Sequence, residues 1–125
     1  MKFYEICVIR HFSGAHRLAD YQGNCERLHG HNWKVEMFLR RDKLDSSGLA
    51  VDFRIVKKKL DQVLVLLDHQ YLNEIAAFKK INPTAENIAR FIYQSLSLKF
   101  RANVFVSKVI VWESDFCSAA YWEKE

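Results

Sequence analysis

The sequence has 125 residues, of which 50% are hydrophobic and 14% aromatic, and its formal net charge is +4. This length predicts one domain, residues 1–125, and this apolar content excludes an intrinsically disordered chain. The 4 glycines and 1 proline exclude collagen-like and low-complexity classes, and no stretch approaches the ~20 apolar residues of a membrane span.

The charge pattern bears on partners and location. The modest positive charge is compatible with an anionic small-molecule substrate, whereas the short basic runs at 40–41 and 57–59 do not predict a nucleic-acid partner. Glu5 and Arg10 interrupt the N-terminal apolar segment, which therefore lacks the pattern of a secretory signal. We expect a cytoplasmic protein without nucleic-acid or membrane partners.

Two strands are predicted in the first third of the chain. Residues 2–13 alternate crudely between apolar and polar side chains, residues 14–28 contain turn-forming residues and predict a loop, and residues 29–41 alternate again. The apolar side chains of the second strand that share one face are Trp33, Val35, Met37 and Leu39.

Two helices follow. Apolar residues recur at three- and four-residue steps after Asp52, which is suited to cap the first helix, and this helix is expected to end near 68–71. Pro83 disfavours helix at the residue before it, and Thr84 is suited to cap a second helix. Alternation returns at 104–111, with a turn near 114–115, so the order of elements predicts an α+β fold.

Three of the five histidines lie close together in the sequence: His16, His29 and His31. Residues two apart on a strand project from the same face, so His29 and His31 can converge with His16 from the end of the preceding strand. Three imidazoles with an open fourth position are typical of a catalytic zinc site. The alternative is a set of surface or hydrogen-bonded core histidines.

Three cysteines without tight spacing do not predict a disulfide framework. Cys25 lies among polar residues beside the candidate metal site, where positive charge favours the thiolate, so it is either a fourth zinc ligand or a general base. Cys7 and Cys117 stand among apolar or small residues and are expected in the core.

Two further sets of polar residues are candidates for catalysis or ligand binding. Asp68 and His69 form either an ordinary helix-terminal pair or an acid/base pair in which the carboxylate stabilises the protonated imidazole. Glu113 ends an apolar strand and is either solvated or reserved for a ligand, since its two oxygens can accept two parallel N–H bonds.

Taken together, six segments resemble the 6-pyruvoyl-tetrahydropterin synthase / 6-carboxy-tetrahydropterin synthase family over nearly the whole chain. In order they are Phe12-Ser13-Gly14-Ala15-His16, Cys25-Glu26-Arg27-Leu28-His29-Gly30-His31-Asn32, Val51-Asp52-Phe53, Leu67-Asp68-His69-Gln70-Tyr71-Leu72-Asn73, Asn82-Pro83-Thr84-Ala85-Glu86-Asn87 and Trp112-Glu113-Ser114. The resemblance implies the tunnelling fold: a four-stranded antiparallel sheet with two helices on one face. It also implies trimeric barrels that stack into a homohexamer, with active sites between subunits.

The resemblance implies roles by position. His16, His29 and His31 would bind Zn²⁺, Cys25 would be the general base, and Asp68 and His69 would complete a proton relay. Glu113 would take part in catalysis by anchoring the pterin ring. Thr84, Ala85, Asp52 and Phe53 would line the pterin pocket.

The spacing between Cys25 and His29 resembles the bacterial carboxy-type branch of the queuosine (7-deazaguanine) pathway. The enzymes of this branch are zinc-dependent lyases that convert 7,8-dihydroneopterin triphosphate into 6-carboxy-5,6,7,8-tetrahydropterin, with loss of acetaldehyde and triphosphate. The alternatives are a 6-pyruvoyl-tetrahydropterin synthase acting on the same substrate, or a non-catalytic zinc- or pterin-binding module. A branch forming 6-hydroxymethyl-dihydropterin places Glu where Cys25 stands, and Gly14 departs from the more usual Ala.

Overall fold

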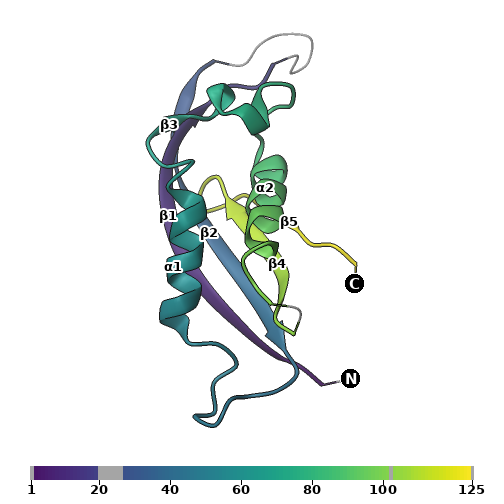
Figure 1. The fold of residues 1–125 in the computed structure, drawn as a ribbon. Helices are drawn as coiled ribbons and strands as arrows, with labels where there is room; N and C mark the ends of the chain where they lie inside the picture. Colours follow the sequence, from purple (N-terminus) through teal and green to yellow (C-terminus); the bar gives the residue numbers. More distant parts are fainter. Residues whose placement is uncertain (1, 20–26, 102, 125) are drawn as a thin grey trace.

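A computed structural model describes residues 2–19, 27–101 and 103–124. Two α-helices and a five-stranded sheet make up the fold, with two short 3-10 turns between the helices (Figure 1). In chain order the elements are β1 (Tyr4–His16), β2 (His29–Arg41), α1 (Phe53–Leu64), β3 (Gln70–Tyr71), η1 (Leu72–Glu74), η2 (Ala76–Phe78), α2 (Ala85–Ser97), β4 (Phe105–Trp112) and β5 (Ser118–Tyr121).

The sheet has the strand order β3-β1-β2-β4-β5. The long strands β1 and β2 pair antiparallel over their whole length, from Tyr4 opposite Arg41 to His16 opposite His29. The expected α+β class is confirmed, but the expected count of four strands is wrong, because β3 adds a fifth strand parallel to β1. Two residues are too few to show an alternation in the sequence.

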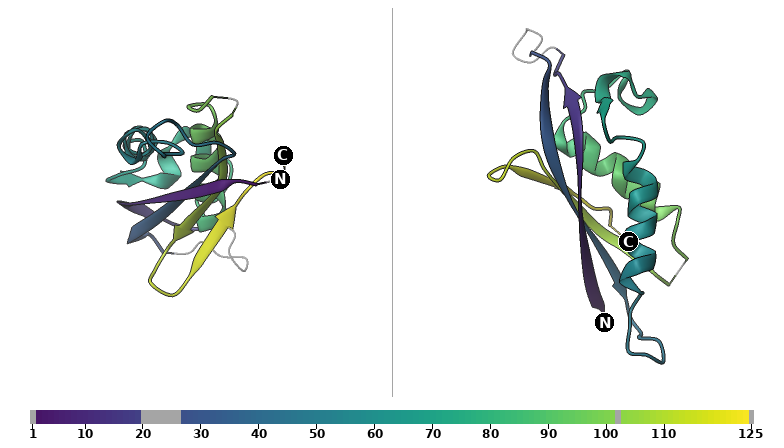
Figure 2. Two further views of the ribbon diagram at one scale, coloured as in Figure 1. Left: turned by 90° about the horizontal axis from the view of Figure 1, so that it is seen from below. Right: turned by 90° about the vertical axis from the view of Figure 1, so that its left-hand side faces the viewer.

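Both helices cover the same face of the sheet, as the side view shows (Figure 2). Trp33, Val35 and Met37 of β2 are fully buried beneath them, together with Leu60 of α1 and Ile92 of α2. The alternation of β2 therefore predicted the core face correctly. No helix of the described residues covers the opposite face of the sheet.

Both helices begin where the sequence predicts. The Asp52 side chain accepts a hydrogen bond from the Arg54 N–H, and the Thr84 hydroxyl accepts one from the Asn87 N–H. Each cap satisfies a backbone donor that has no partner within the helix. The first helix ends at Leu64, earlier than expected, and β1 runs through His16 into the predicted loop.

A β-bulge interrupts the pairing of β4 with β2. Val106 lies opposite Leu39 and Lys108 lies opposite Phe38, so Ser107 is an extra residue on β4. The bulge explains why the buried valines of this strand, Val106 and Val109, are three residues apart and not two.

The two described cysteines differ from the core expectation. Cys7 is half-buried, and Cys117 is exposed in the segment between β4 and β5, so the core assignment of Cys117 is wrong. The small residues after Cys117 suggested a buried segment. Cys117 instead precedes the short edge strand β5, which the helices leave partly uncovered. Neither helix in the described ranges has the length and apolarity that a membrane crossing requires.

Candidate metal centre

The pairing of β1 with β2 brings three histidines together at one end of the sheet. His16 lies directly opposite His29, and His31 lies opposite Gly14, two residues before His16. Because side chains alternate along a strand, all three imidazoles project from the helix-covered face, beyond the buried ring of Trp33. The predicted convergence of the three histidines is therefore present in the geometry.

Backbone carbonyls orient two of the rings. Nδ1 of His16 lies 2.7 Å from the carbonyl oxygen of Pro83, and Nδ1 of His29 lies 2.7 Å from that of Arg27. A carbonyl only accepts, so each Nδ1 carries the hydrogen and, in the neutral ring, each Nε2 carries a lone pair. These second contacts orient metal-binding imidazoles in known metal sites.

The two Nε2 atoms of His16 and His29 lie only 3.0 Å apart. Two lone pairs at this distance repel each other unless a cation or a shared proton lies between them. His16 is also 2% exposed, so water does not relieve the contact. This arrangement fits a metal ion bound by both nitrogens.

Glu113 adds a fourth donor. Its Oε1 lies 2.9 Å from Nε2 of His31 and 3.8 Å from Nε2 of His16. Nε2 of His31 is buried and lacks a hydrogen-bond partner among the described residues, because it is not aligned with the carboxylate for such a bond. One ligand atom from each of the four residues lies within 4.8 Å of the others.

The electrostatics favour neutral imidazole at His31. Burial lowers the pKa of His31 below its ordinary value, the charge of Glu113 opposes this, and His29 and His16 lower it further. Neutral imidazole is the form that binds metal. The donor set of three imidazole nitrogens and one carboxylate oxygen suits Zn²⁺, which accepts both ligand types.

Trp33 supports the cluster and was not singled out from the sequence as a site residue. Its indole N–H donates to the carbonyl of Gly14 at 3.1 Å, and its ring packs edge-on against the rings of His16 and His31. Its position two residues after His31 on the same strand was the available signal. A Cβ at Gly14 would lie 3.3 Å from the Phe12 ring and 3.4 Å from Leu72, so glycine relieves a tight contact there.

Asp68 and His69 are attached to β1 at Ser13. The Ser13 N–H donates to Oδ1 of Asp68 at 2.9 Å, and the His69 N–H donates to the Ser13 carbonyl at 2.6 Å. Nδ1 of His69 lies 3.0 Å from Oδ2 of Asp68. The bond from Ser13, and then the contacts with His69, hold the pKa of Asp68 below its ordinary value, so this carboxylate is ionised and orients the imidazole.

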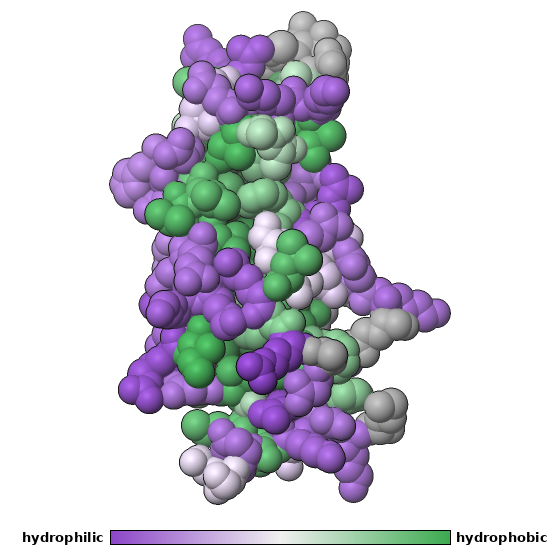
Figure 3. All heavy atoms as spheres, in the orientation of Figure 1, coloured by the Kyte–Doolittle hydropathy of each residue, from purple (hydrophilic) through white to green (hydrophobic). Residues whose placement is uncertain are grey.

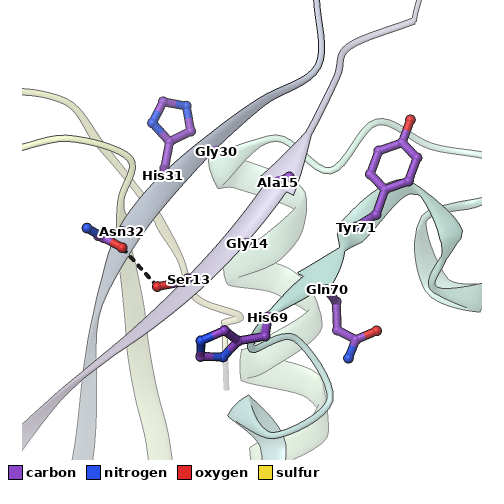
Figure 4. Close-up of a pocket in the computed structure, with 9 residues that line it drawn as sticks. All are labelled: Ser13, Gly14, Ala15, Gly30, His31, Asn32, His69, Gln70 and Tyr71. Atoms are coloured by element: carbon purple, nitrogen blue, oxygen red, sulfur yellow. Dashed lines mark hydrogen bonds between the residues drawn. The ribbon is translucent and has the colours of Figure 1, made fainter.

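A hollow of about 500 Å³ crosses β1 beside these residues. His31 on β2 and His69 before β3 both line it, with β1 between them, and the Ser13 hydroxyl donates to Asn32 on its floor (Figure 4). His69 has a positive φ of 58°, a backbone conformation that costs energy outside glycine and is often found at functional sites. The hollow thus has His31 of the histidine cluster and His69 of the candidate proton-relay pair in its lining.

The remaining predicted residues fall into three groups. Thr84 and Ala85 follow Pro83 and so lie beside His16. Asp52 and Phe53 come after the other end of β2, and a 13-residue strand separates them from His29 by about 40 Å. A single chain does not bring them to the histidines. Cys25 lies outside the described residues.

Comparisons with known proteins identify the family of the chain. Residues 5–124 match the family described as 6-pyruvoyl tetrahydropterin synthase. The chain is 36% identical over 90 residues to the 6-carboxy-5,6,7,8-tetrahydropterin synthase of Synechocystis sp., covering 68% of each. It is 33% identical over 90 residues to the dihydroneopterin monophosphate aldolase of Pyrococcus furiosus, covering 72% of the chain and 74% of the relative.

The fold is likewise that of solved members. The structure of Caenorhabditis elegans 6-pyruvoyl tetrahydropterin synthase superposes with a TM-score of 0.82 and 24% identity, covering 99% of this chain and 98% of the other. Because the family matches residues 5–124, nearly the whole length, the chain belongs to the 6-pyruvoyl tetrahydropterin synthase family.

Proposed function

We propose that the protein is a zinc-dependent 6-carboxy-5,6,7,8-tetrahydropterin synthase that converts 7,8-dihydroneopterin triphosphate in the cytoplasm, within 7-deazaguanine (queuosine) biosynthesis. The observation that carries the proposal is the pair of facing Nε2 atoms of His16 and His29, with His31 and Glu113 beside them. Relatives named for this activity, such as the Synechocystis protein, support it.

The proposed roles are those that the family resemblance implies, and contacts among the described residues support part of them. His16, His29 and His31 would hold the metal, and a zinc ion there supplies Lewis-acid polarisation of the substrate side-chain hydroxyls. His69, oriented by Asp68, supplies or receives a proton across the hollow. Cys25, as a thiolate, takes the other proton. Glu113 accepts the amino and ring N–H groups of the pterin in two parallel bonds.

We also propose that the working unit is a homo-oligomer, a hexamer built as a dimer of trimers. Asp52 and Phe53 lie far from the histidines of their own chain, so they can line the pterin pocket only by reaching the site of another copy. The sheet offers an edge for such assembly, because β3 pairs only with Gly14 and Ala15 of β1, and no other strand of the described residues covers the rest of that edge.

A second candidate is a non-catalytic zinc-binding module. It is favoured by the position of Glu113, which lies close enough to His31 to act as a fourth ligand and close the site. A closed four-ligand zinc site leaves no position for substrate and is structural. A 6-pyruvoyl-tetrahydropterin synthase would use the same substrate with a different product.

Product analysis tests the proposal. The purified, zinc-loaded protein is incubated with 7,8-dihydroneopterin triphosphate, and the pterin product is identified by mass spectrometry. We expect 6-carboxy-5,6,7,8-tetrahydropterin, and protein stripped of metal by a chelator serves as the control. A pyruvoyl product would support the other synthase, and an unchanged substrate would support the binding module.

A further inference from the structure

A second pocket adjoins the metal centre and is strongly cationic. It measures about 370 Å³ and lies between the end of β1 and the segment that links η2 to α2. Arg17, Lys79 and Lys80 line it, and no carboxylate does so among the described residues. Figure 3 shows hydrophilic atoms gathered at this end of the molecule.

Two asparagines fix the frame of this pocket. Asn73 accepts from the Arg17 N–H at 3.0 Å and donates to the Arg17 carbonyl at 2.9 Å. Asn82 makes the same pair of bonds with Ala19, at 2.8 and 2.9 Å. Each side-chain amide thus bonds both the N–H and the carbonyl of one residue. These four bonds fix the distance between the backbone at Arg17 and Ala19 and the segments that carry Asn73 and Asn82.

Two segments of the chain connect the pocket to the candidate metal centre. On one side Arg17 directly follows His16, and on the other side Asn82 directly precedes Pro83, whose carbonyl orients the His16 ring. Successive Cα atoms are about 3.8 Å apart, so Arg17 lies one residue step from His16 and Asn82 one step from Pro83, which is close enough for one ligand with an extended arm to reach both sites.

The basic groove along α1 differs from this pocket in one respect. The groove along α1 contains Lys57 and Lys58, but it also contains Asp61, which forms an ion pair with Arg10 at 3.0 Å. The carboxylate of Asp61 neutralises part of the positive charge there. The pocket beside the metal centre has no such neutralisation from a described residue, which makes it the better site for a polyanion.

We propose that the pocket of Arg17, Lys79 and Lys80 binds the triphosphate arm of the substrate while the pterin lies at the metal centre. This inference rests on the proposed function. Arginine and lysine form strong charge-assisted bonds to phosphate oxygens. Three cations match an arm of three phosphates better than a single phosphate, so the pocket also selects the triphosphate ester over the monophosphate.

Binding, measured apart from turnover, tests the proposal. The probes are neopterin triphosphate and neopterin, titrated into the zinc-loaded protein by pterin fluorescence, and the ratio of their affinities isolates the contribution of the phosphates. In Lys79→Gln/Lys80→Gln we expect this ratio to fall by about tenfold or more, as for the loss of charged hydrogen bonds. Affinity for neopterin and the zinc content should not change.

A matched pair on α1 provides the control. Lys57→Gln/Lys58→Gln removes the same charge from adjacent exposed lysines and should leave the ratio within about twofold of wild type. In turnover, the Lys79/Lys80 variant should lower kcat/KM for dihydroneopterin triphosphate, because the lost bonds hold the triphosphate both in the bound substrate and as it leaves in the proposed reaction.

The outcomes separate the two proposals. Normal conversion of the triphosphate with an unchanged affinity ratio in Lys79→Gln/Lys80→Gln overturns the pocket assignment and leaves the proposed function standing. A ratio that falls in this variant, with no conversion by the wild type, supports the pocket as a triphosphate site and overturns the proposed reaction. An equal fall in the Lys57/Lys58 control also overturns the pocket assignment, because a general charge effect then explains it.

Discussion

Oε1 of Glu113 lies 2.9 Å from Nε2 of His31, although the two residues belong to different parts of the chain and were expected to serve different purposes. The short distance places the proposed pterin anchor directly at the metal centre. A substrate held by Glu113 would therefore have its side chain next to the metal, which is the geometry that proximity catalysis requires.

Glu113→Gln separates substrate binding from metal binding. The amide keeps the size of the side chain but loses the charge and presents a donor to the pterin donors. We expect kcat/KM to fall by an amount that corresponds to a loss of roughly 2–5 kcal/mol in transition-state binding, the range for breaking a buried charged pair. Metal analysis should show an unchanged zinc content. Loss of zinc in this variant would instead identify Glu113 as a fourth ligand.

His31→Ala should remove most of the bound zinc and most of the activity, because two imidazoles rarely hold Zn²⁺ well. His11→Ala is the matched control, since His11 lies on the same pair of strands but is exposed and outside the donor cluster. Metal content is measured by atomic emission after gel filtration. A full complement of zinc in His31→Ala would contradict the proposed ligand set.

Cys25→Ala should keep zinc and substrate affinity but lower kcat by about 10²-fold or more, the scale of general-base catalysis. Cys117→Ala removes an exposed thiol elsewhere and should match the wild type. Turnover and zinc content are measured on the same samples. Zinc lost in proportion to activity would make Cys25 a ligand and not a base.

The carboxyl of Asp68 should titrate below its ordinary pKa of 3.8, chiefly because the Ser13 N–H donates to it. A carboxyl whose pKa is lowered by folding stabilises the folded state above the unfolded pKa, and this contribution is lost as the pH falls through the folded pKa. The carboxyl-carbon NMR shift of Asp68 gives the midpoint directly. In His69→Ala the pKa of Asp68 should stay below 3.8. An ordinary midpoint in that variant would show that His69, and not the Ser13 N–H, is the main cause of the lowered pKa.

Shared active sites predict complementation between inactive variants. His31→Ala damages the metal centre, and Phe53→Ala changes an exposed residue that is proposed to reach another copy. Mixed and reassembled, the two variants should recover about a quarter of the wild-type activity, since each site draws one half from each of two randomly mixed chains. Activity that stays at the level of the separate variants would mean that each site is complete within one chain.

Much of the fold could be predicted because the signals are local. Alternation along β2 marked its buried face, and Asp52 and Thr84 marked both helix starts through their side-chain oxygens. The H-x-H spacing placed His29 and His31 on one face of a strand. These inferences need only the geometry of a strand or of a helical turn.

What could not be predicted depends on pairing between distant segments. The sequence around Asp68 does not reveal that its carboxylate accepts from Ser13, because that bond forms only when the segment before β3 docks beside β1. The separation of Asp52 and Phe53 from the histidines depends on the length and direction of β2. Both facts require the register of the sheet, which no local pattern supplies.

The extra residue at Ser107 decides which way the end of β4 faces. Counting back from Glu113 in steps of two gives Val111 and Val109, which lie on the core face only because the bulge inserts one residue after Val106. Without that insertion the parity of the strand would reverse, and Glu113 would point away from the histidines toward the uncovered side of the sheet. A single-residue irregularity near the start of β4 thus determines which side chain reaches the histidines just beyond its end.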